Sequence, residues 1–267
     1  MDLQIKGKRA LVTGSSSGIG ESIAKFLAKE GVHIMAHGRN EKELSRVVDE
    51  IQKVGGKADK IQADLSTDEG AKKAAQATIE KLGGIDILIN NAGAYPMRGW
   101  KNSSPQDWID LFNQNVVSTV RLILEFLPMM RKQKYGRFIQ FGSVVGTRPF
   151  ADEADYAVTK SAHILISVSL SQELAGTGIT ANTISPGPIQ TPGLEDLFHK
   201  IAKEKGWGTK WEEIEANMIK KVLPNPCNRL GKPEEIAAAV AFIASPLAGY
   251  INGANIRVDG GGSFCIN

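Results

Sequence analysis

A tyrosine and a lysine four residues apart, Tyr156 and Lys160, form the first pair whose types and spacing could do chemistry. On a helix, residues at this spacing share a face. A phenol normally ionises near pKa ~10, which is too high for easy proton exchange at neutral pH. An ammonium about 4 Å away, at an effective dielectric near 20, favours the phenolate by ~4 kcal/mol, or about three pKa units. The pair therefore predicts a general acid-base catalyst with a lowered tyrosine pKa.

Ser143 follows the predicted strand that precedes this helix. From the end of that strand its hydroxyl is expected to reach the same pocket and to hydrogen-bond a carbonyl oxygen. A simpler interpretation is that the hydroxyl only satisfies backbone groups at the strand end.

A glycine-rich turn, Thr13-Gly14-Ser15-Ser16-Ser17-Gly18-Ile19-Gly20, joins the first predicted strand to the first predicted helix. Its glycines would let the backbone approach a pyrophosphate, and the helix N-terminus offers free N–H groups. The same residues match G-x-S-x-G, the nucleophile elbow of hydrolases, with Ser16 as the nucleophile. That alternative needs a later acid and a histidine, and only His163 and His199 lie well downstream. A plain turn without a ligand is the third interpretation.

The end of the second predicted strand, Ala36-His37-Gly38-Arg39-Asn40, discriminates between the two nicotinamide cofactors. A carboxylate here would hold the ribose 2′-hydroxyl of NAD. No carboxylate precedes Asn40, whereas Arg39 supplies a forked cation suited to a 2′-phosphate. The sequence therefore predicts NADP(H). His33 and His37 are interpreted as packing or surface residues, and no metal site is predicted.

Short apolar segments alternate with helical segments along the whole chain. The predicted strands are residues 9–13, 32–36, 57–63, 85–90, 137–142, 179–184 and 255–258. Four predicted helices are residues 18–30, 67–82, 155–175 and 233–244. A further helix is opened by an Asn40–Glu43 capping box and has Leu44, Val47, Val48 and Ile51 on one face. The longest helix is expected from residue 104 to about 134, with a kink at Pro128. Apolar strands joined by helices indicate one doubly wound α/β domain, a Rossmann fold over residues 1–267. We expect about seven parallel strands, helices on both faces, and a site at the strand carboxyl ends.

Residues 186–232 form a segment that is too long for a plain connection. We expect residues 188–230 to be a substrate-binding lid. Two apolar stripes at helical spacing lie within it: Leu194, Leu197, Phe198 and Ile201, then Trp207, Trp211, Ile214, Met218 and Val222. Such stripes are more often core packing than substrate contacts. Together with Tyr95, Trp100 and Phe150 on neighbouring loops, Leu194 indicates an apolar pocket mouth and a medium-sized apolar or aromatic ketone as substrate.

Composition excludes several classes of protein. Of the 267 residues, 42% are hydrophobic and 23% charged, which rules out wholesale disorder. A net charge of +3 gives no reason to expect nucleic-acid binding. Cys227 and Cys265 are too far apart for a disulfide framework or a metal cluster. The N-terminus lacks the apolar core of a signal peptide, and the longest apolar run, 236–244, is too short to span a bilayer, so we expect a cytoplasmic protein without a membrane partner.

Several motifs, taken together, resemble the short-chain dehydrogenase/reductase family over essentially the whole chain. Thr13-Gly14-x-x-x-Gly18-x-Gly20 is similar to the glycine motif of that family. Asn90-Asn91-Ala92-Gly93 resembles its sheet-stabilising and cofactor-lining motif, and Asp64-Leu65 its adenine-contacting pair. Residues 182–191 resemble the segment that grips the nicotinamide end of the cofactor.

The resemblance implies a catalytic tetrad of Asn115, Ser143, Tyr156 and Lys160. Ser143 would hold a substrate carbonyl that Tyr156 protonates, Lys160 would bind the nicotinamide ribose, and Asn115 would hold a relay water. The implied cofactor is NADP(H), bound by Gly14, Ser16, Ser17, Gly18, Ile19, Gly20, Arg39, Asp64, Leu65, Asn91, Ala92, Gly93, Tyr156, Lys160, Pro186, Gly187, Ile189 and Thr191. Simpler roles remain open, namely a solvated position for Asn115, strand tying for Asn90 and turn capping for Asp64.

Within the family, Val258-Asp259-Gly260-Gly261 and residues 142–147 resemble 3-oxoacyl-[acyl-carrier-protein] reductases. Thr177 stands where those enzymes typically carry a basic carrier-docking residue, and Leu127-Pro128 replaces a second one, so a carrier protein as partner stays open. A non-catalytic NADPH-binding regulator is the competing class, and the complete tetrad favours an enzyme. The resemblance also implies a homo-oligomer, a dimer or tetramer built through residues 105–134 and 155–175.

Overall fold

The structure, a computed structural model, describes residues 1–264, so Cys265 lies outside the described residues. Seven parallel strands form one sheet in the order β3-β2-β1-β4-β5-β6-β7. The strands are β1 (Arg9–Val12), β2 (His33–Gly38), β3 (Lys57–Gln62), β4 (Ile87–Asn90), β5 (Gly136–Phe141), β6 (Ile179–Pro186) and β7 (Asn255–Val258). This confirms the predicted doubly wound α/β fold.

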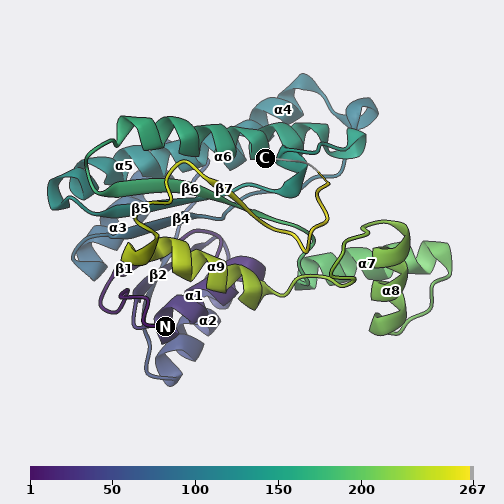
Figure 1. Cartoon of the computed structure of the whole chain (residues 1–267), viewed down its shortest axis with the longest axis horizontal. Helices are drawn as coiled ribbons and strands as arrows, with labels where there is room; N and C mark the ends of the chain where they lie inside the picture. The colour runs from purple at the N-terminus through teal and green to yellow at the C-terminus, as the bar shows by residue number, and fades with distance from the viewer. Residues whose placement is uncertain (265–267) are drawn as a thin grey trace.

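Helices cover both faces of the sheet (Figure 1). One face carries α1 (Gly18–Lys29), α2 (Glu41–Lys53) and α9 (Pro233–Ala244), and the other α3 (Asp68–Leu82), α5 (Ser118–Gln133) and α6 (Ala154–Glu173). Because side chains alternate along a strand, Ile87 and Ile89 enter the first apolar core and Leu88 the second. A central strand such as β4 is therefore buried on both faces, whereas β3 at one edge of the sheet carries polar and partly exposed residues.

The helix expected over residues 104–134 is three segments. A capping box between Ser104 and Asp107 opens α4 (Pro105–Phe112), a π-helical turn follows over Asn113–Val117, and α5 comes after it. The break in the α-helical pattern thus lies at the π turn, whereas Pro128, where we expected a kink, lies within α5. A π turn accommodates one extra residue, and apolar spacing alone does not reveal it.

The long connection between β6 and α9 holds two helices, α7 (Pro192–Lys205) and α8 (Trp211–Lys221), to one side of the sheet (Figure 1). They pack on each other through a separate apolar core that includes Phe198, Ile214 and Met218. The predicted stripes are thus largely core packing. Val222 is half exposed and lies outside this core. A lid function for the segment remains a prediction.

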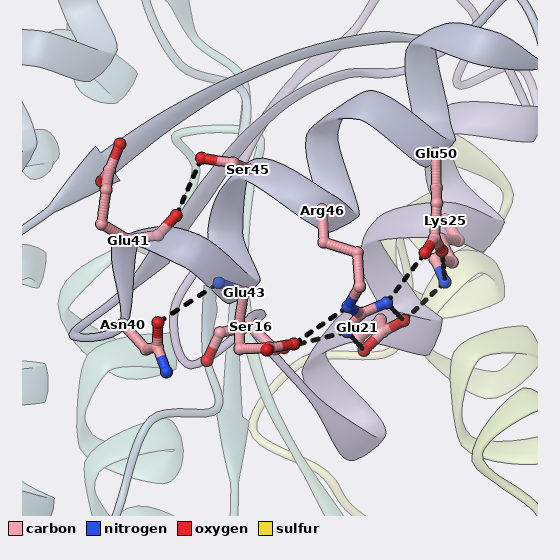
Figure 2. A network of polar contacts seen from close by, with 9 residues as sticks. All are labelled: Ser16, Glu21, Lys25, Asn40, Glu41, Glu43, Ser45, Arg46 and Glu50. Atoms are coloured by element: carbon pink, nitrogen blue, oxygen red, sulfur yellow. Dashed lines mark hydrogen bonds and ion pairs between the residues drawn. The ribbon is translucent and has the colours of Figure 1, made fainter.

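An ion-pair network joins α1 and α2 behind the glycine-rich turn (Figure 2). The Arg46 guanidinium donates to both carboxylate oxygens of Glu21, at 2.9 and 2.7 Å. Burial acts to raise the pKa of Glu21, but hydrogen bonds from Arg46 and Lys25 outweigh it and leave that pKa lowered. Arg46 also donates to the main-chain oxygen of Ser16 at 3.4 Å, so the network braces the turn.

The Asn40–Glu43 capping box is half formed (Figure 2). The Asn40 side chain accepts from the Glu43 N–H at 3.2 Å, as predicted. The Glu43 carboxylate instead accepts from Arg46 at 2.9 Å, because the guanidinium offers a charged donor.

Two of the central helices leave large apolar side chains exposed. Leu124 on α5 and Leu165 on α6 are 63% and 68% exposed. A second copy of the chain would bury such surface, and the expected oligomer stays a prediction. Among residues 1–264, no helix combines the length and the hydropathy that crossing a bilayer requires.

Candidate functional site

Hydrogen bonds join the loops that follow β1 and β4, which are neighbours in the sheet. Thr13 Oγ1 accepts from the N–H groups of Asn91 and Ala92, both at 2.9 Å. The Asn91 amide donates to the main-chain oxygens of Thr13 and Gly14, at 2.9 and 3.1 Å. The strand order reverses at this pair of strands, and doubly wound sheets bind ligands at such a point.

The glycines of the turn are required by its backbone. Gly14 and Gly18 have φ angles of +64° and +58°, a region that side chains disfavour. A Cβ on Gly20 would lie 2.2 Å from the Gly14 main-chain oxygen. The first N–H groups of α1 are left free of a side-chain cap, since Ser17 at the N-cap supplies none. The turn can therefore cradle an anion.

A cavity of about 280 Å³ opens beside this turn. Predicted cofactor-binding residues line it: Gly14, Ser16, Ser17, Arg39, Asp64, Leu65, Asn91, Ala92 and Gly93. His37, Gly38, Ala63, Ser66, Gln114 and Ser118 line it as well, and sequence reasoning missed them. The cavity thus brings together the ends of β1, β2, β3 and β4.

Two charged residues of the cavity differ in how they are held. Arg39 is exposed, and no ion pair joins its guanidinium to another residue within 1–264. Asp64 accepts from the N–H and the hydroxyl of Ser66, at 3.0 and 2.7 Å, and these bonds lower its pKa. Turn capping by Asp64, the simpler interpretation, is therefore present.

His37 ties three loops of the cavity together. Its Nδ1 accepts from the Gly14 N–H at 3.4 Å, and its Nε2 donates to the Ala63 oxygen at 3.1 Å in the tautomer that these partners select. Burial lowers the pKa of His37 to about 4, so the ring is neutral at physiological pH. With both nitrogens occupied, this histidine is not available as a base for Ser16. Its place near the end of β2, the strand that pairs with β1, could have signalled the role, because the glycine-rich turn follows β1.

Asn115 sits in the π turn, fully buried. Its Oδ1 accepts from the Ala94 N–H at 2.8 Å, and its Nδ2 donates to the Ala94 oxygen and to Thr159 Oγ1, at 3.0 and 3.1 Å. A solvated mid-helix position is therefore the wrong interpretation. The amide instead fixes the loop after β4 against α6.

Ser143, Tyr156 and Lys160 meet at the carboxyl end of β5. Ser143 accepts from the Val145 N–H at 3.3 Å and hydrogen-bonds with Tyr156. Lys160 Nζ lies 5.4 Å from the centre of the Tyr156 ring. The same ammonium donates to the Phe141 main-chain oxygen at 2.8 Å. The structure thus brings the predicted serine, tyrosine and lysine together.

The expected lowering of the Tyr156 pKa is wrong for this arrangement. Burial raises that pKa above its ordinary value, the charge of Glu153 raises it further, and the bond with Ser143 opposes both. Lys160 does not offset burial because its ammonium is bonded to Phe141, and burial lowers the pKa of Lys160 to about 8. Tyr156 is therefore a protonated phenol at neutral pH, able to donate a proton.

Of the predicted substrate residues, Tyr95 reaches Tyr156. The two ring centres are 4.7 Å apart in an edge-on contact, and the Tyr95 hydroxyl donates to Glu153 at 2.6 Å. Trp100 packs on Trp108 of α4, with ring centres 5.2 Å apart. The other two lie elsewhere: Phe150 beside the Arg148 guanidinium, and Leu194 in the packing between α7 and α8.

The segment after β6 returns to the glycine-rich turn. Gly187 donates to the Val258 oxygen at 3.0 Å, and a Cβ there would lie 2.8 Å from the Asp259 Cα. Ile189 pairs with Gly231. Thr191 caps α7, and its methyl carbon lies 3.4 Å from where a Gly18 Cβ would be. Thr191 therefore lies beside the glycine-rich turn, and the cofactor contacts expected of residues 186–191 stay a prediction.

Comparison with known proteins agrees with this geometry. The family model described as short chain dehydrogenase matches residues 8–202. The chain is 38% identical over 264 residues to the uncharacterized oxidoreductase YvaG of Bacillus subtilis, covering 98% of each chain. It is 35% identical to the 3-oxoacyl-[acyl-carrier-protein] reductase FabG of Vibrio cholerae, covering 97% of this chain and 98% of that one. L-sorbose reductase from Gluconobacter frateurii, complexed with NADPH and L-sorbose, is similar in structure, with a TM-score of 0.94, 32% identity and full coverage of both chains.

The buried ammonium of Lys160 predicts a pH-dependent cost to stability. Below pH 8 both the folded and the unfolded chain carry this charge. Between pH 8 and the ordinary value of 10.5 the folded chain loses it first, so the stability of the wild type rises with pH. Lys160→Met should therefore stabilise the chain at pH 7 by up to about 3 kcal/mol, because burial lowers the pKa of Lys160 from 10.5 to about 8. The gain should shrink toward pH 10.

Urea denaturation at pH 7 and pH 10 measures this difference. Lys42→Met is the matched control, because Lys42 is exposed on α2 and forms no hydrogen bond or ion pair within residues 1–264. A Lys160→Met variant that is no more stable at pH 7, or whose gain grows with pH, would contradict the burial argument.

Proposed function

Because the chain belongs to the short-chain dehydrogenase family, we propose that it is an NADP(H)-dependent oxidoreductase that interconverts a carbonyl and a secondary alcohol. One observation carries the proposal. Ser143, Tyr156 and Lys160 converge at the end of β5, and the cavity beside the glycine-rich turn is lined by the residues expected to bind the cofactor. A regulator that only binds the cofactor would not need the convergent side chains.

In the proposed reaction, NADPH when bound supplies a hydride to the carbonyl carbon. The Ser143 hydroxyl holds the carbonyl oxygen, and the protonated Tyr156 gives it a proton. The ammonium of Lys160 replaces that proton on Tyr156 and binds the nicotinamide ribose. Asn115 keeps the loop after β4 in place and would hold a water that relays the proton outward.

NADP(H) is the proposed cofactor because Arg39 stands at the end of β2 with its guanidinium unpaired within residues 1–264. A forked cation in that position suits a 2′-phosphate. Gly14, Gly18 and Gly20 would allow the backbone to approach the pyrophosphate. The structural neighbour from Gluconobacter frateurii is itself complexed with NADPH, which supports the proposal.

Tyr156→Phe tests the proposed proton donor. The change removes the hydroxyl alone, so turnover should fall by about 10²-fold or more while the Kd for NADPH stays within about twofold. NADPH absorbance at 340 nm reports turnover, and cofactor fluorescence reports binding. Turnover near that of the wild type would remove Tyr156 from the mechanism.

Arg39→Ala tests the choice of cofactor. Loss of a charge-assisted hydrogen bond to a 2′-phosphate should weaken NADPH binding by about 10- to 100-fold and leave NADH binding unchanged. Fluorescence titration with both cofactors measures the ratio of the two Kd values, with Lys42→Ala as the control for loss of a nearby positive charge. A wild type that already prefers NADH would show the assignment to be wrong.

The substrate we propose is a medium-sized apolar or aromatic ketone. Tyr95, which contacts Tyr156, is 47% exposed and offers aromatic surface to a ligand beside the proposed proton donor. Trp100 and Phe150, on neighbouring loops, are 68% and 42% exposed. A 3-oxoacyl chain on a carrier protein is the second candidate, because FabG of Vibrio cholerae is similar over nearly the whole chain.

A substrate panel separates these candidates. Initial rates at 340 nm with aromatic ketones, L-sorbose and 3-oxoacyl thioesters should give the highest kcat/KM for the aromatic ketones, since apolar contacts of one ring are worth about 2 kcal/mol or more. The Tyr156→Phe variant supplies the background rate. Turnover confined to sugars or short polyols would contradict the apolar pocket, and turnover confined to acyl thioesters would favour the carrier-linked substrate.

A further inference from the structure

The loop after β4 carries an arginine that reaches two other elements at the border of the proposed catalytic site. The Arg98 guanidinium forms an ion pair through Nη1 with Asp107 in the first turn of α4. Its Nη2 lies 3.5 Å from Oδ2 of Asp155 in the first turn of α6. The next residue along α6 is Tyr156, the proposed proton donor. Arg98 therefore connects the loop, α4 and α6 beside the reacting group.

The two carboxylates that Arg98 contacts differ in their exposure to solvent. The Asp107 side chain is 37% exposed, whereas that of Asp155 is 3% exposed. Within residues 1–264 the Asp155 Oδ2 accepts no hydrogen bond, so the nearby Arg98 charge is what offsets this buried carboxylate. A buried carboxylate that loses its charge partner is strongly destabilising. Asp155 therefore depends on Arg98 far more than Asp107 does.

Asp155 also holds the main chain of the proton donor. The first N–H groups of a helix have no partner within the helix, and Glu153 at the N-cap of α6 supplies no side-chain acceptor. The Asp155 Oδ1 accepts from the Tyr156 N–H at 2.8 Å. A phenol gives up its proton only at hydrogen-bond distance from the carbonyl oxygen, so a small displacement of this turn would misplace the reacting O–H.

Two further contacts join the same loop to the turn that leads into α6. The Tyr95 hydroxyl donates to Glu153 at 2.6 Å, and the Gly99 N–H donates to the Asp152 main-chain oxygen at 3.0 Å. The loop is thus tied to the start of α6 at three points. The ion pair of Arg98 is the one that reaches the residue directly before the proton donor.

We propose that Arg98 is a positioning residue, which fixes the first turn of α6 through the buried Asp155 carboxylate and so aims the Tyr156 hydroxyl at the substrate carbonyl oxygen. The inference rests on the proposed function. Arg98 takes no part in the transfer of hydride or proton. The two charges act as a unit, because loss of the arginine alone leaves a buried charge uncompensated and loss of both leaves none.

A double-mutant cycle tests the proposal, with initial rates at 340 nm on the best ketone of the substrate panel. Arg98→Met should lower kcat about tenfold and leave the KM for NADPH within about twofold. Asp155→Asn keeps an oxygen for the Tyr156 N–H and should lower kcat by about threefold or less. Adding Arg98→Met to Asp155→Asn should then lower kcat by less than about twofold more, since no buried carboxylate is left unpaired.

Asp152→Asn is the matched control, because Asp152 is an exposed carboxylate in the turn before α6 and forms no ion pair within residues 1–264. In that background Arg98→Met should still lower kcat about tenfold. An equal loss of kcat from Arg98→Met with and without the Asp155 carboxylate would overturn the proposal. So would an Arg98→Met variant with the kcat of the wild type.

Thermal unfolding supplies a readout that does not depend on turnover. Arg98→Met should lower the Tm, and adding Asp155→Asn should restore most of the loss. Rescue of the Tm without rescue of kcat would leave Arg98 a purely structural role and overturn the proposal. If Arg98→Met alone does not fold, the double variant decides, because a kcat about tenfold below that of Asp155→Asn would contradict the pairing. If Tyr156→Phe stays active, the proposed function fails instead, and the Tm values still report whether Arg98 and Asp155 pair.

Discussion

The site depends on the hydrogen bonds that Asn91 and Thr13 make across the ends of β1 and β4. These strands are neighbours in the sheet although β2 and β3 lie between them in the chain. Four bonds of 2.9 to 3.1 Å fix the glycine-rich turn against the loop after β4. Because the strand order reverses here, the connected loops leave on opposite sides, and a crevice opens between them. The cavity and the catalytic side chains both adjoin this point.

Burial governs the chemistry of the proposed catalytic pair. It raises the pKa of Tyr156 and lowers that of Lys160 to about 8, so both shifts disfavour charge in the interior. A protonated phenol is the form that carbonyl reduction needs. The ammonium of Lys160 costs stability, which proteins commonly accept at functional sites.

The sequence was enough to predict the architecture, because apolar strands alternating with helices admit few other folds. It also predicted the cofactor loops, since the turn at Gly14 and the motif around Asn91 have local signatures. Features set by side-chain contacts between distant elements were not predictable. Lys160 donates to Phe141, His37 joins three loops, and the π turn at Asn113–Val117 leaves the apolar periodicity unchanged.

The central claim is that the site at the carboxyl ends of the strands promotes hydride transfer from a bound nicotinamide to a carbonyl carbon. Reduction of an aromatic ketone with NADPH that carries deuterium at both C4 positions of the nicotinamide tests it most directly. The account predicts that the label appears on the carbinol carbon of the product, as read by mass spectrometry and NMR. A product that carries no label at that carbon, or a cofactor that is consumed without any alcohol being formed, would contradict it.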